Sequence, residues 1–266
     1  MAGNLVPRTD GGSDLGTAAK EYGTIYAKNF GGTIAAKINA AISGGGNAKA
    51  PVYIYTSGTY TVPEGVTTLY ISGCAGGGGG SAVYGGGAGE SVKRKKITVT
   101  PGEQITVTIG AGGNASVSDK KTYTTPSAAA GSGGDTSFGS YLTLRGGKGA
   151  TYSGSSDSIS TWPERGGNGG TDGEVACLTF KNENATVWKG GTGGSTMFGI
   201  GGSGGSFNQG LATTGSSSAV NQYKNGTDGI GYGSGGGGCA LIAVSAGLYI
   251  SGAGNGASGL IIVELT

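Results

Sequence analysis

Residues 68–80 read TLYISGCAGGGGG, so that a strand-like apolar segment passes directly into five consecutive glycines. Similar runs recur along the chain, which has 63 glycines among 266 residues. Ordering a residue costs roughly 1–2 kcal/mol of backbone entropy, and glycine lies at the upper end of that range. Regular packing must offset this cost. Because glycine has no side chain, extended segments can pack side by side through N–H···O and Cα–H···O bonds. The runs therefore predict a packed polyglycine-II lattice.

Three other structures are typical of glycine-rich sequence. Collagen is excluded because the chain has only six prolines and no strict Gly-X-Y period. A phosphate-binding loop is disfavoured because no run continues into Lys-Ser or Lys-Thr ahead of a helical pattern. A flexible linker remains an alternative. However, short segments with apolar side chains at 136–139 and 196–199 indicate that the chain is held in place between the runs. The runs are Gly76–Gly80, Gly85–Gly89, Gly110–Gly113, Gly131–Gly134, Gly146–Gly149, Gly166–Gly170, Gly190–Gly194, Gly201–Gly205, Gly229–Gly238 and Gly252–Gly256.

Strand patterns flank the first and last runs. Apolar residues alternate with polar ones over several short segments, and Pro101-Gly102 is typical of a hairpin turn. We expect about eight strands, with the last one in the same sheet as residues 60–72. The predicted fold is mainly β: an antiparallel β-sandwich base with a polyglycine-II lattice and loop inserts. The predicted strands include 52–55, 58–62, 68–71, 97–99, 105–109, 241–244 and 260–265.

The N-terminal part differs from the rest, and two domains are expected. Residues 1–48 form an attachment or shaft segment, and residues 49–266 form the glycine-rich domain. A helix is predicted over 33–43, with Ile34, Ile38 and Ile42 on one face. This narrow stripe, with Tyr22 and Tyr26 before it, favours a parallel bundle of identical chains. Docking of the stripe on the chain's own sheet is the alternative.

Polar inserts separate the glycine runs at 114–130, 150–165, 171–189, 206–228 and 245–251, and they carry aromatic side chains. Aromatic residues on loops held by a stiff scaffold are typical of a recognition surface. In the alternative, each aromatic caps its own glycine segment and faces inward, as we expect for about half of them. The candidate receptor-binding residues are Tyr123, Tyr152, Trp162, Trp188, Phe207, Tyr223 and Tyr249.

Composition and charge disfavour several functions. A net charge of +2 is too small to favour nucleic acid, and the cluster at Lys93–Lys96 is better explained as a solvated strand edge. The chain has no histidine, so a zinc site and general-base catalysis are disfavoured, and neither a metal nor a cofactor is expected. The cysteines Cys74, Cys177 and Cys239 are expected to be small buried hydrophobes. Neither a membrane span nor a signal peptide is predicted, so we expect synthesis in the cytoplasm.

Four ordered blocks of the sequence carry a resemblance to a known family. The blocks are 60–69 running into 76–80, 89–102, 106–113 and 259–264. They resemble the glycine-rich C-terminal domain of bacteriophage tail fibres, over about residues 60–266. The glycine runs are also similar to those of the distal adhesins of T-even-type phages. A shorter block, Asp14–Thr17 with Tyr22 and Ile25–Ala27, looks like an element of tail-fibre shafts.

The resemblance implies a non-enzymatic adhesin of the virion, at the tail fibre or tail tip, that binds a bacterial glycan or outer-membrane protein through the inserts. Its partners would be that receptor and other tail or baseplate proteins. The adhesins have an N-terminal domain that caps a separate fibre, whereas residues 1–45 here look like a shaft or attachment segment, which favours a homotrimer; a monomeric cap on a fibre remains the alternative. A glycan depolymerase would need paired carboxylates, for which Asp157, Glu164, Asp172 and Glu174 are the candidates. A purely structural tail component is the third possibility.

Overall fold

Alternating apolar residues build two sheets that face each other in the computed structural model. The described residues contain only strands and irregular segments, so the fold is mainly β. The predicted helix over 33–43, with Tyr22, Tyr26, Ile34, Ile38 and Ile42, lies outside them. The structure describes residues 50–82, 84–117, 121–123, 127–153, 177–181, 185–207, 223–244 and 247–265, all within one compact unit, Ala48–Thr266.

The predicted β-sandwich base is confirmed. Its two sheets are four-stranded and antiparallel, and they enclose a core that includes Leu69, Ile71, Phe138 and Ile261, each fully buried. The last strand pairs with β3, as the sequence predicts. The first sheet has the order β1 (Val52–Ile54), β19 (Leu260–Leu265), β3 (Thr68–Cys74), β4 (Ser91–Thr98), and the second β2 (Gly58–Thr61), β5 (Gln104–Thr108), β8 (Thr136–Phe138), β9 (Leu142–Leu144).

The turn at Pro101-Gly102 forms, but the predicted hairpin is wrong. Glu103 N–H donates to the carbonyl of Thr100 at 3.1 Å, and Gly102 has φ +78°, as position i+2 of a type II turn requires. However, β4 pairs with β3, while β5 pairs with β2 and β8. The turn therefore carries the chain from one sheet to the other, because both flanking strands bury apolar residues in the same core.

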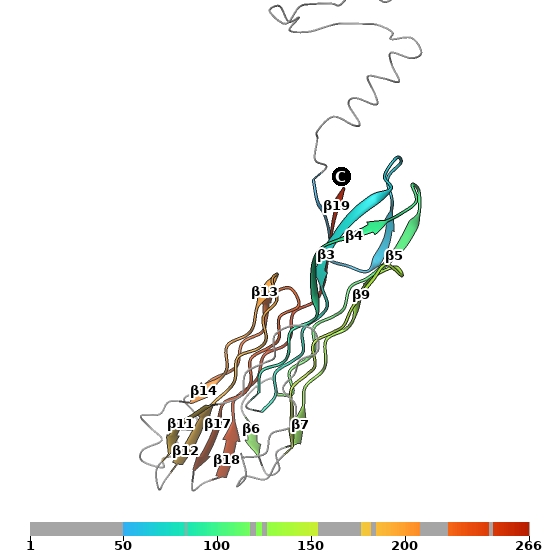
Figure 1. The fold of residues 1–266 in the computed structure, drawn as a ribbon. Helices are drawn as coiled ribbons and strands as arrows, with labels where there is room; N and C mark the ends of the chain where they lie inside the picture. The colour runs from blue at the N-terminus through green and yellow to red at the C-terminus, as the bar shows by residue number, and fades with distance from the viewer. Residues whose placement is uncertain are drawn as a thin grey trace, which may run out of the picture. The chain divides into compact units, whose positions relative to one another are not determined.

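Beyond the sandwich, the glycine runs extend side by side toward a group of short strands at the far end (Figure 1). The segment 76–81 lies at the centre, and each of its residues is buried. Residues three apart donate to the same neighbouring segment, and the three neighbours differ. Gly76 and Gly79 donate to Gly134 and Gly131, Gly77 and Gly80 to Ala257 and Gly254, and Gly78 and Ser81 to Gly87 and Tyr84.

Three further segments donate to this central one, again at intervals of three residues. A period of three with no bonds inside the segment is the geometry of a polyproline-II-type helix. The central segment is therefore hydrogen-bonded to neighbours on all sides, and the predicted polyglycine-II lattice is present. In this second set, Gly147 and Ala150 donate to Gly76 and Gly79, Gly113 and Ser116 to Gly77 and Gly80, and Gly236 and Cys239 to Gly78 and Ser81.

The segment 235–239 is a second interior helix of the lattice. All of its residues are buried, and two of its amides donate to Gly194 and Gly191. Two others, those of Gly236 and Cys239, bond to the central segment itself, so the two interior helices are direct neighbours. The amides of both helices thus have partners on other segments, which removes the cost of burying unpaired backbone.

The inserts, expected to be loops, contain strands where the structure describes them. Residues 241–244 do not join the sandwich and belong to a distal sheet formed mainly by the inserts. Insert strands pair because their backbone groups need partners once the lattice ends. The distal sheet has the order β11 (Cys177–Lys181), β12 (Ala185–Lys189), β17 (Leu241–Val244), β18 (Gly247–Ile250), β6 (Lys121–Tyr123). Three two-stranded pairs are β10 (Thr151–Ser153) with β7 (Ser127–Ala129), β13 (Gly199–Ile200) with β16 (Ile230–Gly231), and β14 (Ser206–Phe207) with β15 (Tyr223–Lys224).

Candidate functional site

The distal sheet is attached directly to the lattice, at the end away from the sandwich (Figure 1). β17 continues from the interior helix 235–239, β12 leads into the run 190–194, and β18 leads into 251–257. Ser251 fixes one of these junctions, because its buried Oγ accepts a hydrogen bond from Ala240 N–H at 2.8 Å. Hydrogen-bonded backbone therefore determines the position of the sheet.

One face of the distal sheet closes the end of the lattice. Trp188 lies opposite Leu241, and Leu241 lies opposite Ile250, so the three side chains share a face. Leu241 and Ile250 are buried in a second apolar cluster with Tyr84, and the half-buried Trp188 packs against it. Trp188 thus has a packing role, as the inward-facing alternative predicts.

Tyr249 lies on the opposite face of the same sheet. Its partner across β17 is Ile242, which in turn lies opposite Val187 on β12. Ile242 and Val187 are buried, whereas Tyr249 is half-buried. Trp188 and Tyr249 therefore point to opposite sides and do not form one contact surface.

The pair β14–β15 brings two candidate residues together. β14 contacts β12 and β17, and its Phe207 is only 4% exposed. The ring of Tyr223 on β15 lies 6.1 Å from the Phe207 ring and is half-buried. Phe207 supports the strand pair from within, and Tyr223 is the member of the pair that reaches the surface.

Most of the candidate residues lie on the short insert strands, although their role in binding stays a prediction. Tyr123 and Tyr152 belong to β6 and β10, while Trp162 lies outside the described residues. Of the four candidates with described side chains, Tyr223 and Tyr249 are partly exposed without belonging to either apolar cluster. Aromatic content alone does not separate them from the others, because it does not show which face of a strand is buried.

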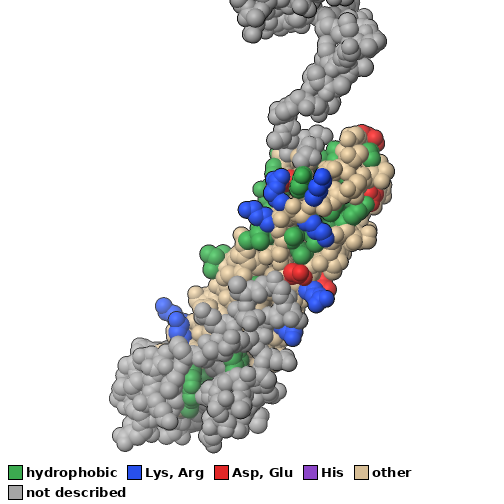
Figure 2. Space-filling model, in the orientation of Figure 1, with side chains coloured by type: hydrophobic (Ala, Val, Ile, Leu, Met, Phe, Trp, Pro, Cys, Tyr) green, Lys and Arg blue, Asp and Glu red, His purple; other side chains and the backbone are tan. Residues whose placement is uncertain are grey.

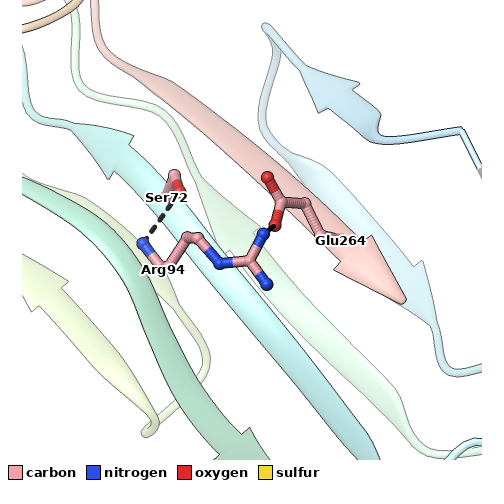
Figure 3. Close-up of polar contacts among 3 residues, drawn as sticks. All are labelled: Ser72, Arg94 and Glu264. Atoms are coloured by element: carbon pink, nitrogen blue, oxygen red, sulfur yellow. Dashed lines mark hydrogen bonds and ion pairs between the residues drawn. The ribbon is translucent and has the colours of Figure 1, made fainter. Parts of the chain in front are cut away.

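The sandwich end carries a cluster of cations. Lys93–Lys96 lie on β4, an edge strand, as predicted, and Lys and Arg side chains gather over this end (Figure 2). Arg94 forms an ion pair with Glu264 on β19, and its guanidinium lies 4.8 Å from the centre of the Tyr70 ring. Its backbone N–H donates to Ser72 Oγ at 2.9 Å (Figure 3). These contacts hold the edge strand at the irregularity in its pairing with β3.

Sequence reasoning missed a group of exposed apolar residues. Three of them lie in or beside β13 and β16, which are too short for a periodic pattern to reveal. Their exposure follows from a two-stranded ribbon that leaves these side chains uncovered. The large hydrophobic side chains exposed in the described chain are Val52, Tyr53, Tyr55, Met197, Ile200 and Ile230.

Cysteine and acidic side chains are the ones in this chain that could serve in metal binding. Cys74 and Cys239 are fully buried, as expected, and burial raises the pKa of the Cys74 thiol to about 12. Among the residues that the structure describes, no group of three or more His, Cys, Asp and Glu side chains is placed to hold a metal. No helix in the described part of the chain is long and apolar enough to span a bilayer. The candidate carboxylates Asp157, Glu164, Asp172 and Glu174 lie outside the described residues.

Comparison with known proteins identifies one family. A search of the curated proteins found no match for this chain. A family model described as a glycine-rich domain matches residues 51–266, a range that includes the sandwich, the lattice and the distal sheet. The chain therefore belongs to this glycine-rich domain family.

Proposed function

We propose that this protein is a bacteriophage tail fibre or tail-tip adhesin that binds a bacterial surface glycan or outer-membrane protein through its distal inserts. In this proposal it is not an enzyme, and it acts as part of the virion. Membership of the glycine-rich domain family and the resemblance of residues 60–266 to tail-fibre domains support the proposal. The observation that carries it is the attachment of the distal strands directly to buried lattice helices.

The proposed mechanism is rigid presentation of the inserts. Binding loses affinity when groups must be ordered on contact, at roughly 0.5–1.5 kcal/mol for each immobilised side chain. The interior helices 76–81 and 235–239 hold the strand ends in place before any contact, since their residues are buried and hydrogen-bonded to neighbouring segments. Several copies on one virion would add avidity to weak individual contacts.

Among the residues with described side chains, Tyr223 and Tyr249 fit contact with a receptor best. Each is half-buried, so the ring is held on one side while part of it is accessible. A tyrosine in this position gives a large contact area at a small entropy cost. Trp162 belongs to the same proposal on the sequence alone, because it lies in a polar insert.

The test is binding of fluorescently tagged full-length protein to a panel of bacterial strains. We expect strain-selective binding that leaves the surface glycan intact, and a loss of at least about tenfold in affinity for Trp162→Ala combined with Tyr249→Ala. Tyr141→Ala is the matched control, because Tyr141 is a half-buried tyrosine that packs on the sandwich core, and its removal should not affect cell binding.

Each other outcome counts against a specific part of the proposal. Full binding by the double variant would place the contact surface elsewhere. Release of glycan during incubation would favour the depolymerase and would direct attention to the insert carboxylates. Failure of the folded protein to bind any strain would favour a structural tail component.

A further inference from the structure

Exposed apolar residues lie in or beside β1 and the β13–β16 ribbon, and we call them the apolar patch: Tyr53, Tyr55, Met197, Ile200 and Ile230. We propose that the apolar patch is an interface with a second copy of this chain. The proposal does not depend on receptor binding, because the patch belongs to the first sheet of the sandwich and to the ribbon, and not to the distal sheet.

Stacked tyrosine rings link parts of the patch that are far apart in the sequence. The rings of Tyr53 and Tyr55 are stacked with centres 6.3 Å apart, and Tyr55 stacks on Tyr232 at 5.6 Å. Tyr232 follows β16 directly and donates its N–H to the carbonyl of Phe198, beside β13. The tyrosine stack thus joins β1 to the ribbon, which projects from the side of the lattice near the sandwich (Figure 1).

The degree of exposure is unusual for isoleucine. Ile200 and Ile230 lie directly opposite each other across the ribbon, and they are 70% and 67% exposed. Large apolar side chains exposed together in this number amount to an area on the order of several hundred Å², the size that marks an interaction site on a monomeric protein. A stable interface buries about 800 Å² on each partner, so the patch would supply a large part of one side.

The two outer strands of the first sheet differ in a way that supports association at this surface. β4 carries Lys93–Lys96, and cations on an edge strand oppose edge-to-edge pairing. β1 lies at the other edge of the same sheet, and its sequence Val52-Tyr53-Ile54 carries no charge. One edge is therefore protected by cations, while the edge beside the patch is apolar.

Two arguments favour a second copy over another protein as the occupant. The patch consists of Tyr, Met and Ile without a charged member, and homo-oligomer interfaces are the more apolar class. In addition, the isoleucine stripe that ends at Ile42 predicts association of identical chains. The ten residues from there to Val52 reach at most about 35 Å, so copies joined through the stripe would keep their patches at a high effective concentration.

The first test is cross-linking of the full-length protein through a thiol placed in the patch. In Ile230→Cys, a short bifunctional maleimide should join two copies, because the new thiol would lie at the interface. Thr143→Cys is the control, at an exposed position on β9. Wild-type protein treated in the same way gives the background of cross-linked product that arises from its own cysteines. We expect the Ile230→Cys product to exceed both the control and the background severalfold.

The second test is the mass of the protein in solution, measured by light scattering over a series of concentrations. The test variant combines Ile200→Lys with Ile230→Glu, which makes the patch polar and retains an attractive pair across the ribbon. Both positions are highly exposed, so the variant should keep its circular dichroism spectrum. We expect the folded variant to dissociate to single chains at a concentration at least tenfold higher than the concentration at which the wild-type oligomer dissociates.

Each result decides for or against the proposal. Selective cross-linking at Ile230→Cys, or earlier dissociation of the double variant on dilution, would support it. A wild-type protein that is monomeric throughout would overturn it, and would favour docking of the chain's own N-terminal segment. An oligomer that cross-links equally at both thiols would also overturn it, because association would then depend on residues outside the patch.

Discussion

At the scale of single residues, the lattice leaves no space for a side chain at its centre. A Cβ atom built on Gly79 would lie far inside van der Waals contact of the carbonyl oxygen of Asn114. The obstacle is backbone that is itself hydrogen-bonded, so it cannot move aside without breaking bonds to other segments. Glycine is therefore required here by close approach and not by an unusual backbone angle.

This geometry predicts that Gly79→Ala costs about 4 kcal/mol or more of unfolding free energy, at the extreme of single substitutions. Gly58→Ala is the matched control, because a Cβ at that position meets no atom within 4 Å. We expect the control to keep the wild-type stability within about 1 kcal/mol. Thermal and urea unfolding of the two variants would measure the difference, and equal stability would mean that the lattice is not tightly packed.

Arg94 combines an unfavourable backbone conformation with favourable side-chain contacts. Its φ is +51°, where a residue with a Cβ is strained by about 1–2 kcal/mol. Its ion pair with Glu264 is partly exposed, and such pairs contribute at most about 1 kcal/mol. The contact with the Tyr70 ring adds a contribution of similar size. Strain and contacts therefore nearly cancel.

Two substitutions at this position separate the strain from the contacts. Arg94→Ala keeps the strain and removes the contacts, whereas Arg94→Gly removes both. We expect Arg94→Gly to unfold at a higher urea concentration than Arg94→Ala, by about 1 kcal/mol in free energy, and to stay close to the wild-type protein. The reverse order would show that the strand relaxes when the arginine is removed.

At the scale of elements, the interior glycine helices behave as core despite having neither α-helical nor β-ladder bonds. Every residue of 76–81 is buried, and its amides bond to three different segments. Opening one of these amides to water requires several segments to separate together. The protection of the helix against exchange should therefore reflect the global stability and not local fraying.

Hydrogen–deuterium exchange of backbone amides tests this expectation. Peptides covering 76–81 and 235–239 should exchange as slowly as those covering β3, the inner strand that leads into the lattice. The run 201–205 is the comparison, because it contains the exposed Ser203, and it should exchange faster. Fast exchange in the interior helices would contradict a cooperative lattice.

The sequence predicts elements where a local pattern decides the structure, and it fails where pairing is set at long range. The alternation in 68–71 and the apolar run 260–265 are strong enough to identify β3 and β19, and the glycine runs identify the lattice. The distal sheet is not predicted, because all of its strands except β17 lie in polar inserts and they pair only once the lattice has brought them together. The same limit explains the Pro101-Gly102 turn, since a type II turn is compatible with either a hairpin or a change of sheet.

The candidate site shows the same division between composition and context. Polar composition with aromatics distinguishes the inserts from the lattice, and the distal strands lie in these inserts. Composition does not show that Phe207 is buried and that Trp188 packs on the second cluster, since strand register decides which face each side chain occupies. The exposure of Ile200 and Ile230 likewise depends on a ribbon that only the fold reveals.

At the scale of the whole described unit, the sandwich and the distal sheet are connected through the lattice. The central helix 76–81 begins shortly after β3, and it bonds to the helix 235–239, which leads into β17. Ile261, fully buried in the sandwich, and Trp188, at the distal cluster, therefore lie at opposite ends of one hydrogen-bonded path. Loosening of one end removes support from the segments that hold the other.

This continuity predicts that damage to the sandwich lowers the stability of the distal sheet. Ile261→Ala should lower the free energy of unfolding by about 2–5 kcal/mol. In a Trp162→Phe background, where Trp188 is the remaining tryptophan, its fluorescence should report on the distal cluster. We expect Trp188 fluorescence and far-ultraviolet circular dichroism to give one shared transition, shifted to lower temperature by Ile261→Ala. A Trp188 transition that Ile261→Ala leaves in place would mean that the distal sheet unfolds on its own, and that the lattice separates the two ends and does not couple them.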